Sequence, residues 1–128
     1  MLAGFSISVA LGERVALTGD NGAGKSTALR IAAGLIEPLG GRVVRQGSFG
    51  YATGGERGLL LRLTVRQNMD FFAALQGVQV IEPRAELGLD ELMDRRVASL
   101  SSGQKARVSL AVALVHRPSL LILDEIDA

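Results

Sequence analysis

The chain has 128 residues, a length suited to one domain. Hydrophobic residues make up 48% of it, enough for a folded core and too many for wholesale disorder. The formal net charge of +1 gives no general electrostatic reason to expect nucleic acid or an anionic membrane as a partner. The sequence has no cysteine, which excludes disulfides and thiolate metal sites, and it has neither a membrane-span-length apolar run nor a signal-peptide pattern. We therefore expect a soluble protein that reaches a membrane only through a partner.

The first part of the chain predicts two strands joined by a turn. Apolar side chains alternate with serines over residues 5–9, which is the period of a half-buried strand. Residues 11–13 are expected to form a turn. The apolar run at residues 14–18 predicts a buried strand that leads directly into a glycine-rich loop.

That loop, residues 19–27, fits the phosphate-binding pattern G-x-x-x-x-G-K-[ST]. Glycines allow the chain to form a tight concave nest, with backbone N–H groups directed at phosphate oxygens. The alternative is a glycine-rich turn that happens to precede a helix. A predicted strand before the loop and a predicted helix over residues 26–35 favour the phosphate-binding interpretation, because the helix adds the positive end of its dipole. The expected nucleotide-binding residues are Asn21, Gly22, Ala23, Gly24, Lys25, Ser26 and Thr27.

Two of these residues have specific expected roles. Lys25 can place its positive charge on the β- and γ-phosphates. Ser26 can offer its hydroxyl to Mg²⁺. We therefore predict that the chain binds ATP together with Mg²⁺.

The next segment predicts short strands and then helices. Residues 42–45 and 48–52 are expected to form two strands around Gly47 that pair as a hairpin. Apolar residues at helical spacing predict a helix over 64–76, with Thr64 as its cap and Gly77 at its end. A short helix interrupted at Gly88 is expected over residues 84–92.

The last elements are a buried helix and a buried strand. Residues 102–116 predict a helix that is apolar on most sides and is stopped by Pro118. The continuous apolar run at residues 120–123 predicts a central parallel strand covered on both faces.

Two carboxylates, Asp124 and Glu125, follow this strand at once. The carboxyl ends of strands are where open α/β sheets bind their ligands. Asp124 can hold Mg²⁺, and Glu125 can polarise the water that attacks the γ-phosphate. The alternative is a strand that runs out into an acidic, solvated loop. The phosphate-binding loop upstream favours the catalytic interpretation.

A third motif, Leu-Ser-Ser-Gly-Gln at residues 100–104, directly precedes the buried helix. It predicts a serine-capped helix N-terminus that exposes backbone N–H groups, and hence a second anion site. The alternative is an ordinary N-cap without a ligand. Residue types alone leave these two interpretations open.

The order of the motifs resembles the nucleotide-binding domain of ATP-binding cassette (ABC) proteins. Residues 19–27 resemble the Walker A motif of that family, and residues 120–125 resemble its Walker B motif with the catalytic glutamate. Residues 100–104 resemble the signature LSGGQ, with Ser102 in place of the first glycine. Residues 63–68 look like the helical-subdomain entry of export-type ABC ATPases. The resemblance covers essentially the whole chain.

The resemblance implies an α/β P-loop NTPase fold with a mainly parallel core sheet and an inserted helical subdomain. Residues 1–60 and 117–128 would form the ATP-binding core, and residues 61–116 the helical subdomain. It also implies a head-to-tail pair of domains, in which Ser101, Gly103 and Gln104 would face the ATP held by the partner. The implied activity is ATP hydrolysis, with Lys25 and Glu125 as catalytic residues and Ser26 and Asp124 as Mg²⁺ ligands. The implied location is cytoplasmic, at the inner face of the membrane, through a permease and without nucleic acid.

Three departures from the family pattern accompany this resemblance. No clear aromatic residue for stacking on adenine precedes the phosphate-binding loop. Thr53-Gly54 stands where the family has a glutamine after a strand. The sequence shows no Asp-containing loop and no switch histidine after residue 125; His116 precedes the acidic pair, and we expect it only to add charge at a helix C-terminus. The third departure predicts a truncated domain.

Three functions therefore remain as hypotheses. The first is the ATPase subunit of an ABC transporter, of an exporter type. The second is a soluble ABC ATPase acting on ribosomes or DNA, against which the lack of tandem cassettes or basic extensions argues. The third is a module that binds nucleotide without turnover.

Overall fold

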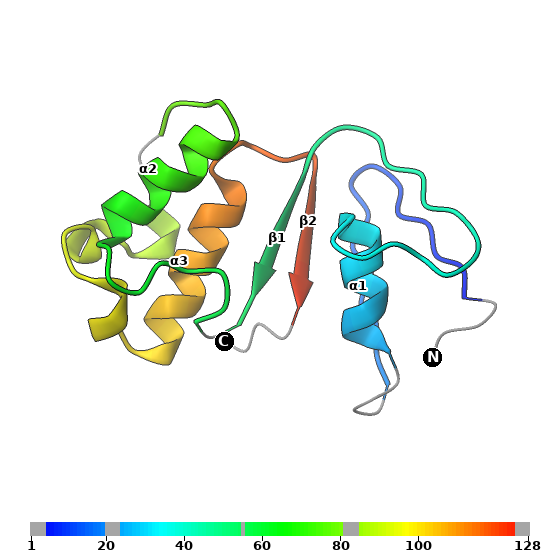
Figure 1. Ribbon diagram of the computed structural model, residues 1–128, viewed down its shortest axis with the longest axis horizontal. Helices are drawn as coiled ribbons and strands as arrows, with labels where there is room; N and C mark the ends of the chain where they lie inside the picture. The colour runs from blue at the N-terminus through cyan, green and yellow to red at the C-terminus, as the bar shows by residue number, and fades with distance from the viewer. Residues whose placement is uncertain (1–4, 20–23, 55, 81–84, 125–128) are drawn as a thin grey trace. The chain divides into compact units, whose positions relative to one another are not determined.

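The computed structural model describes residues 5–19, 24–54, 56–80 and 85–124 (Figure 1). The chain forms two compact units, Met1–Arg45 and Gln46–Ala128, which are described separately below. The elements in chain order are α1 (Lys25–Ala33), β1 (Phe49–Thr53), α2 (Val65–Leu75), the 3-10 turns η1 (Ala85–Leu87), η2 (Asp90–Leu92) and η3 (Val97–Ser99), α3 (Ser102–Leu114) and β2 (Leu120–Asp124).

In the first unit, α1 confirms the helix predicted after the phosphate-binding loop, although it begins at Lys25 and ends at Ala33. Gly34 ends the helix in the left-handed conformation, with φ +82° and its N–H donating to the carbonyl of Ile31 at 3.0 Å. This conformation favours glycine because a side chain would be strained there. The Arg45 guanidinium donates through Nε to the carbonyl of Ala32 at 2.7 Å. A positive charge thus lies at the negative end of the helix dipole.

The strands predicted at residues 5–9, 14–18 and 42–45 are wrong as elements, because the structure describes these residues as turn or irregular chain. The turn at residues 11–13 is confirmed, with the N–H of Glu13 donating to the carbonyl of Ala10 at 3.0 Å. Alternating hydrophobicity specifies which side chains share a face. A strand also requires a neighbouring backbone that completes its hydrogen-bond ladder, and the pattern within one segment cannot supply that neighbour.

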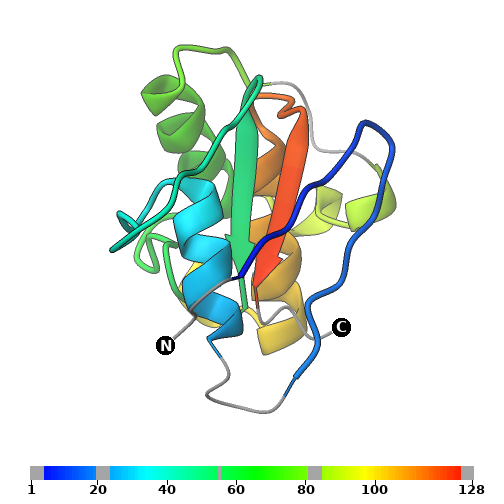
Figure 2. The same cartoon turned by 90° about the vertical axis from the view of Figure 1, so that its right-hand side faces the viewer.

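In the second unit, β1 and β2 form a two-stranded parallel sheet, with Phe49 opposite Leu120 and Thr53 opposite Asp124. The predicted strand at 48–52 is therefore confirmed within one residue, but its predicted hairpin with residues 42–45 is wrong. Its partner is the strand predicted at 120–123 instead. Parallel strands require a crossover, and the helical segment that contains α2 and α3 provides it (Figure 2).

The expectation that residues 120–123 are covered on both faces is not met. Ile122 and Asp124 are buried, but Leu120 is 37% exposed and Leu123 is 48% exposed. A purely apolar run is required only where elements pack on both sides of a strand. Leu120 and Leu123 are therefore not part of the buried core.

The hydrophobic core of the second unit lies mainly within its helical part. α2 and α3 lie side by side, and α3 also packs on β1 (Figures 1 and 2). Fully buried side chains from the turns complete this core, among them Leu89 beside η2 and Val97 in η3. The predicted short helix at 84–92 consists of two separate 3-10 turns, η1 and η2, on either side of Gly88, whose φ is +62°. The turn η3 was not predicted.

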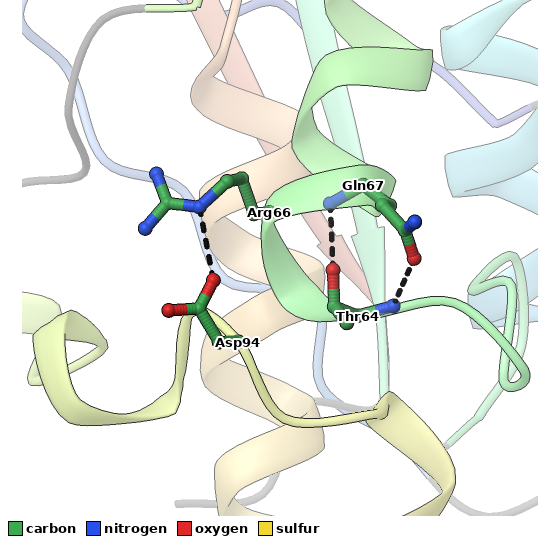
Figure 3. Close-up of polar contacts among 4 residues, drawn as sticks. All are labelled: Thr64, Arg66, Gln67 and Asp94. Atoms are coloured by element: carbon green, nitrogen blue, oxygen red, sulfur yellow. Dashed lines mark hydrogen bonds and ion pairs between the residues drawn. The ribbon is translucent and has the colours of Figure 1, made fainter.

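Helix α2 begins as its sequence predicts. The Thr64 Oγ1 accepts from the N–H of Gln67 at 3.1 Å, and the Gln67 Oε1 accepts from the N–H of Thr64 at 2.9 Å, forming a capping box (Figure 3). Beside it, Arg66 pairs with Asp94 at 3.2 Å, with both side chains largely exposed to solvent. An exposed pair of this kind contributes little to stability. The cap therefore matters more than the ion pair for where the helix begins.

Asn68 fastens the segment before α2 to that helix from a fully buried position. Its Nδ2 donates to the carbonyls of Leu60, at 3.0 Å, and Thr64, at 2.9 Å. Its Oδ1 accepts from the N–H of Leu60 at 2.8 Å. The side chain thus supplies the partner of the Leu60 N–H, and it adds a second donor to two carbonyls that also accept from the backbone N–H groups of Leu63 and Asn68.

We expect Asn68→Ala to lower the free energy of unfolding by about 2 kcal/mol, because the change removes the partner of the Leu60 N–H and two further hydrogen bonds from a fully buried position. Chemical denaturation would measure this loss. Asp70→Ala, at an exposed position of the same helix, is the matched control and should change stability by no more than about 0.5 kcal/mol. Equal effects of the two substitutions would contradict the role given to Asn68.

Candidate nucleotide-binding site

The described part of the phosphate-binding loop consists of its two ends, Gly19 and residues 24–27. Gly24 caps α1 in the left-handed conformation, with φ +90°, so no side chain occupies the cap position. The first turn that follows, residues 25–27, carries no carboxylate. A helix N-terminus of this form offers backbone N–H groups and a positive dipole end to an anion. Asn21, Gly22 and Ala23 lie outside the described residues.

Lys25 lies at the start of α1, and its Nζ donates to the carbonyl of Gly19 at 2.5 Å. The ammonium group is therefore held by the first residue of the motif. Because an ammonium group has three N–H donors, Lys25 can donate to a bound phosphate as well as to the carbonyl of Gly19. Ser26 and Thr27 follow in the same turn. The sequence-predicted roles of all three residues are compatible with where they lie.

Asp124 ends β2 at the carboxyl edge of the sheet and is 4% exposed. Its Oδ2 accepts from the hydroxyl of Tyr51 at 2.6 Å. Its backbone carbonyl accepts from the N–H of Gly54 at 3.2 Å. β1 and the residue after it thus hold both the side chain and the backbone of Asp124. Glu125 lies outside the described residues.

The signature-like residues form the N-terminus of α3, as predicted. Ser101 Oγ accepts from the N–H of Gln104 at 3.1 Å, and Gln104 Oε1 accepts from the N–H of Ser101 at 2.9 Å. The two side chains therefore form a capping box with each other. Gly103 is exposed, and a Cβ added there would meet nothing within 4 Å. The N-terminus of α3 is therefore accessible at Gly103.

Two contacts join α3 to the end of β1 and to the segment that follows it. Ser109 Oγ donates to the carbonyl of Thr53 at 2.9 Å. Lys105, whose side chain is only 11% exposed, forms an ion pair with Glu56. The N-terminus of α3 lies at the same end of the unit as the carboxyl ends of β1 and β2 (Figures 1 and 2). Asp124 and α3 are therefore both held to the end of β1 and the residues just after it.

Sequence analysis missed Tyr51, Glu56 and Lys105 as site residues. No sequence pattern pointed to Tyr51, because its closeness to Asp124 depends on the parallel register of β1 and β2. No local pattern pairs Glu56 with Lys105. The expectation for His116 also needs correction: its Nε2 lies 2.9 Å from the carbonyl of Phe49, so the ring joins the end of the α3 segment to β1.

Mg²⁺ is a hard divalent cation that prefers oxygen ligands, and the oxygens of a bound phosphate can be among them. Among the residues that the structure describes, no three His, Asp or Glu side chains gather into a group that could hold a metal. Mg²⁺ does not need such a cage, since it is usually bound through one or two carboxylates, substrate phosphates and water. The Asp124 carboxylate and the Ser26 hydroxyl are each oxygen groups of the kind that Mg²⁺ prefers. No described helix is long and apolar enough to cross a membrane.

Comparison with known proteins agrees with the motifs. The family model described as ABC transporter matches residues 2–128. The chain is 34% identical over 139 residues to the ABC transporter ATP-binding protein NatA of Bacillus subtilis, covering 94% of this chain and 56% of that protein. It is 42% identical over 127 residues to the cytochrome c biogenesis ATP-binding export protein CcmA of Rhodobacter capsulatus, covering 98% of this chain and 59% of that protein. The chain thus spans a little over half the length of these relatives.

Two solved structures show the same fold. One is a metal-chelate type ABC transporter in an inward-facing conformation, with a TM-score of 0.69 and 25% identity over 84% of this chain and 47% of that one. The other is cbiO1 of Clostridium perfringens, part of the ABC transporter complex cbiONQ, with a TM-score of 0.64 and 28% identity over 84% of this chain and 51% of that one. Together with the glycine-capped loop, the acidic strand end and the capped signature helix, these matches place the chain in the ABC transporter family, with its α/β P-loop NTPase fold.

Proposed function

We propose that this chain binds and hydrolyses ATP as part of an ABC transporter ATPase and energises transport through a membrane permease. The observation that carries the proposal is the start of α1. A left-handed glycine cap and a first turn without a carboxylate leave a helix N-terminus suited to phosphate, with the Lys25 ammonium group held by the first residue of the motif. The family match over residues 2–128 supports a nucleoside triphosphate as the ligand.

In the proposed hydrolysis of ATP, each group of motif residues has its own role. Residues 21–27 bind the phosphates, and Lys25 stabilises the charge that develops on the γ-phosphoryl oxygens. Ser26 and Asp124 would hold Mg²⁺, which would neutralise phosphate charge when bound. Glu125 accepts a hydrogen bond from the attacking water and orients it in line with the leaving group. The water oxygen bonds to phosphorus as the bond to the β-phosphate oxygen breaks.

The signature residues act on a second copy of the domain. Ser101, Gly103 and Gln104 would face the ATP bound by the partner domain in a head-to-tail pair. The exposed glycine and the open space around it support this role, because a second molecule must approach the helix end closely. We infer that residues 1–60 and 117–128 form the ATP-binding core and residues 61–116 the helical subdomain. The pair would work at the inner face of the membrane, bound to its permease.

We expect Lys25→Ala to weaken MgATP binding at least tenfold, because it removes a charge-assisted contact worth about 1.5 kcal/mol or more. Calorimetry on the purified chain and its variant would measure both affinities. Arg30→Ala, a cation lost from the last turn of the same helix, is the matched control and should leave the affinity unchanged.

The same experiment separates the competing functions. Lysine-dependent binding followed by phosphate release supports the proposal. Lysine-dependent binding without release, even at high protein concentration, would identify a nucleotide-binding module without turnover. Absence of MgATP binding by the unmodified chain would overturn the proposal.

A further inference from the structure

The hydroxyl of Tyr51 donates a hydrogen bond to the side chain of Asp124. The O–H···O distance is 2.6 Å, in the range of a charge-assisted bond between a hydroxyl and a carboxylate. Such bonds are roughly twice as strong as those between neutral groups. The bond therefore restricts how the carboxylate can rotate.

The register of the sheet explains why Tyr51 reaches this carboxylate. Asp124 lies opposite Thr53 in the parallel pair, and Tyr51 lies two residues before Thr53. Residues two apart share a face of a strand, so Tyr51 is a diagonal neighbour of Asp124 on the same face of the sheet. The N–H of Gly54 holds the backbone carbonyl of Asp124 at 3.2 Å. The end of β1 thus fixes Asp124 at two separate points.

We infer that Tyr51 is a positioning residue for the metal-binding carboxylate of Asp124. This inference rests on the proposed function, in which Asp124 binds a divalent cation beside the nucleotide. Carboxylates that bind metals are themselves held by outer hydrogen bonds, and loss of such a partner typically lowers metal affinity or activity 10- to 100-fold. Without the phenol, the carboxylate must adopt its binding orientation at an entropic cost each time the cation binds. Tyr51 itself does not touch the reacting atoms.

The test compares ATP affinity with magnesium and with EDTA, by calorimetry. The ratio of the two affinities reports how much the metal strengthens nucleotide binding, and the EDTA value reports whether the phosphate-binding loop is folded. We expect Tyr51→Phe to reduce the ratio roughly tenfold while leaving the EDTA affinity unchanged. Phenylalanine keeps the ring, so packing in the sheet is preserved.

Thr53→Val is the matched control. Thr53 lies on the same face of the same strand, and its hydroxyl donates to the carbonyl of Gly54 at 3.2 Å rather than to Asp124. The substitution removes a hydroxyl near the site and leaves the Asp124 carboxylate unchanged. The ratio should stay within about twofold of the unmodified chain, since the change breaks no bond to the metal-binding group.

Asp124→Asn separates failure of this inference from failure of the proposed function. A lowered ratio in both Tyr51→Phe and Asp124→Asn, but not in Thr53→Val, supports the inference. A lowered ratio in Asp124→Asn with Tyr51→Phe unchanged would overturn the positioning role alone. An unchanged ratio in Asp124→Asn would overturn the metal role of Asp124, and the inference with it. Equal losses in Tyr51→Phe and Thr53→Val would show that the lower ratio comes from a disturbed strand. That result would also overturn the inference.

Discussion

Replacing Gly103 by alanine should lower the rate of ATP hydrolysis about 100-fold while leaving the fold intact. In the proposed pair, the signature helix end approaches the γ-phosphate of the partner's ATP, and a methyl group there would hold the two domains apart. A displacement of about 1 Å at a reacting centre typically costs on the order of 100-fold in rate. Loss of aligned backbone donors has a similar cost.

The same substitution should not destabilise the chain. A Cβ at Gly103 would meet nothing within 4 Å, and the residue lies within α3, so alanine fits its conformation. Alanine in a helix is favoured over glycine by about 0.5–1 kcal/mol. Phosphate release and thermal unfolding, measured on the same preparations over a series of protein concentrations, would separate catalysis from stability.

Gly40→Ala is the matched control for Gly103→Ala. A Cβ at Gly40 also meets nothing within 4 Å, and the position lies outside all three motifs. It should alter neither hydrolysis nor stability appreciably. Normal turnover by Gly103→Ala would show that the signature helix does not approach a nucleotide.

The largest effect on stability is expected for Gly50→Ala. Gly50 lies in β1 directly beneath the C-terminal turns of α3, and a Cβ there would lie 2.2 Å from the carbonyl oxygen of Ala113 and 3.1 Å from Pro118 Cγ. The obstacle is backbone, which cannot move aside as a flexible side chain can. We expect a loss of about 4 kcal/mol, above the usual cost of overpacking a core, and measurable by chemical denaturation.

Gly103→Ala serves here as the stability control, because it adds the same methyl group to the same unit in open space. Magnesium-independent ATP binding would show whether the loss spreads to the phosphate-binding loop. If Gly50→Ala were as stable as Gly103→Ala, the close packing of α3 on β1 would be disproved.

Features with a local cause could be predicted from the amino-acid sequence alone. The cap at Thr64, the serine-capped signature helix and the glycine-started helix α1 each depend on residues within one turn of each other. A side chain that bonds to a backbone N–H three residues away needs no tertiary partner. For this reason the three α-helices were predicted to within two residues at each end.

Only the tertiary structure decided what depends on segments far apart in the chain. The alternation at residues 5–9 predicted a strand, but the pattern carries no information about a neighbouring backbone, and the strand is not there. The partner of β1 is β2 rather than the adjacent residues 42–45, because parallel pairing is set by how the helices between them pack. The bonds from Tyr51 to Asp124 and from Lys105 to Glu56 join residues with no common sequence pattern. They exist because register and helix packing bring these groups within hydrogen-bonding distance.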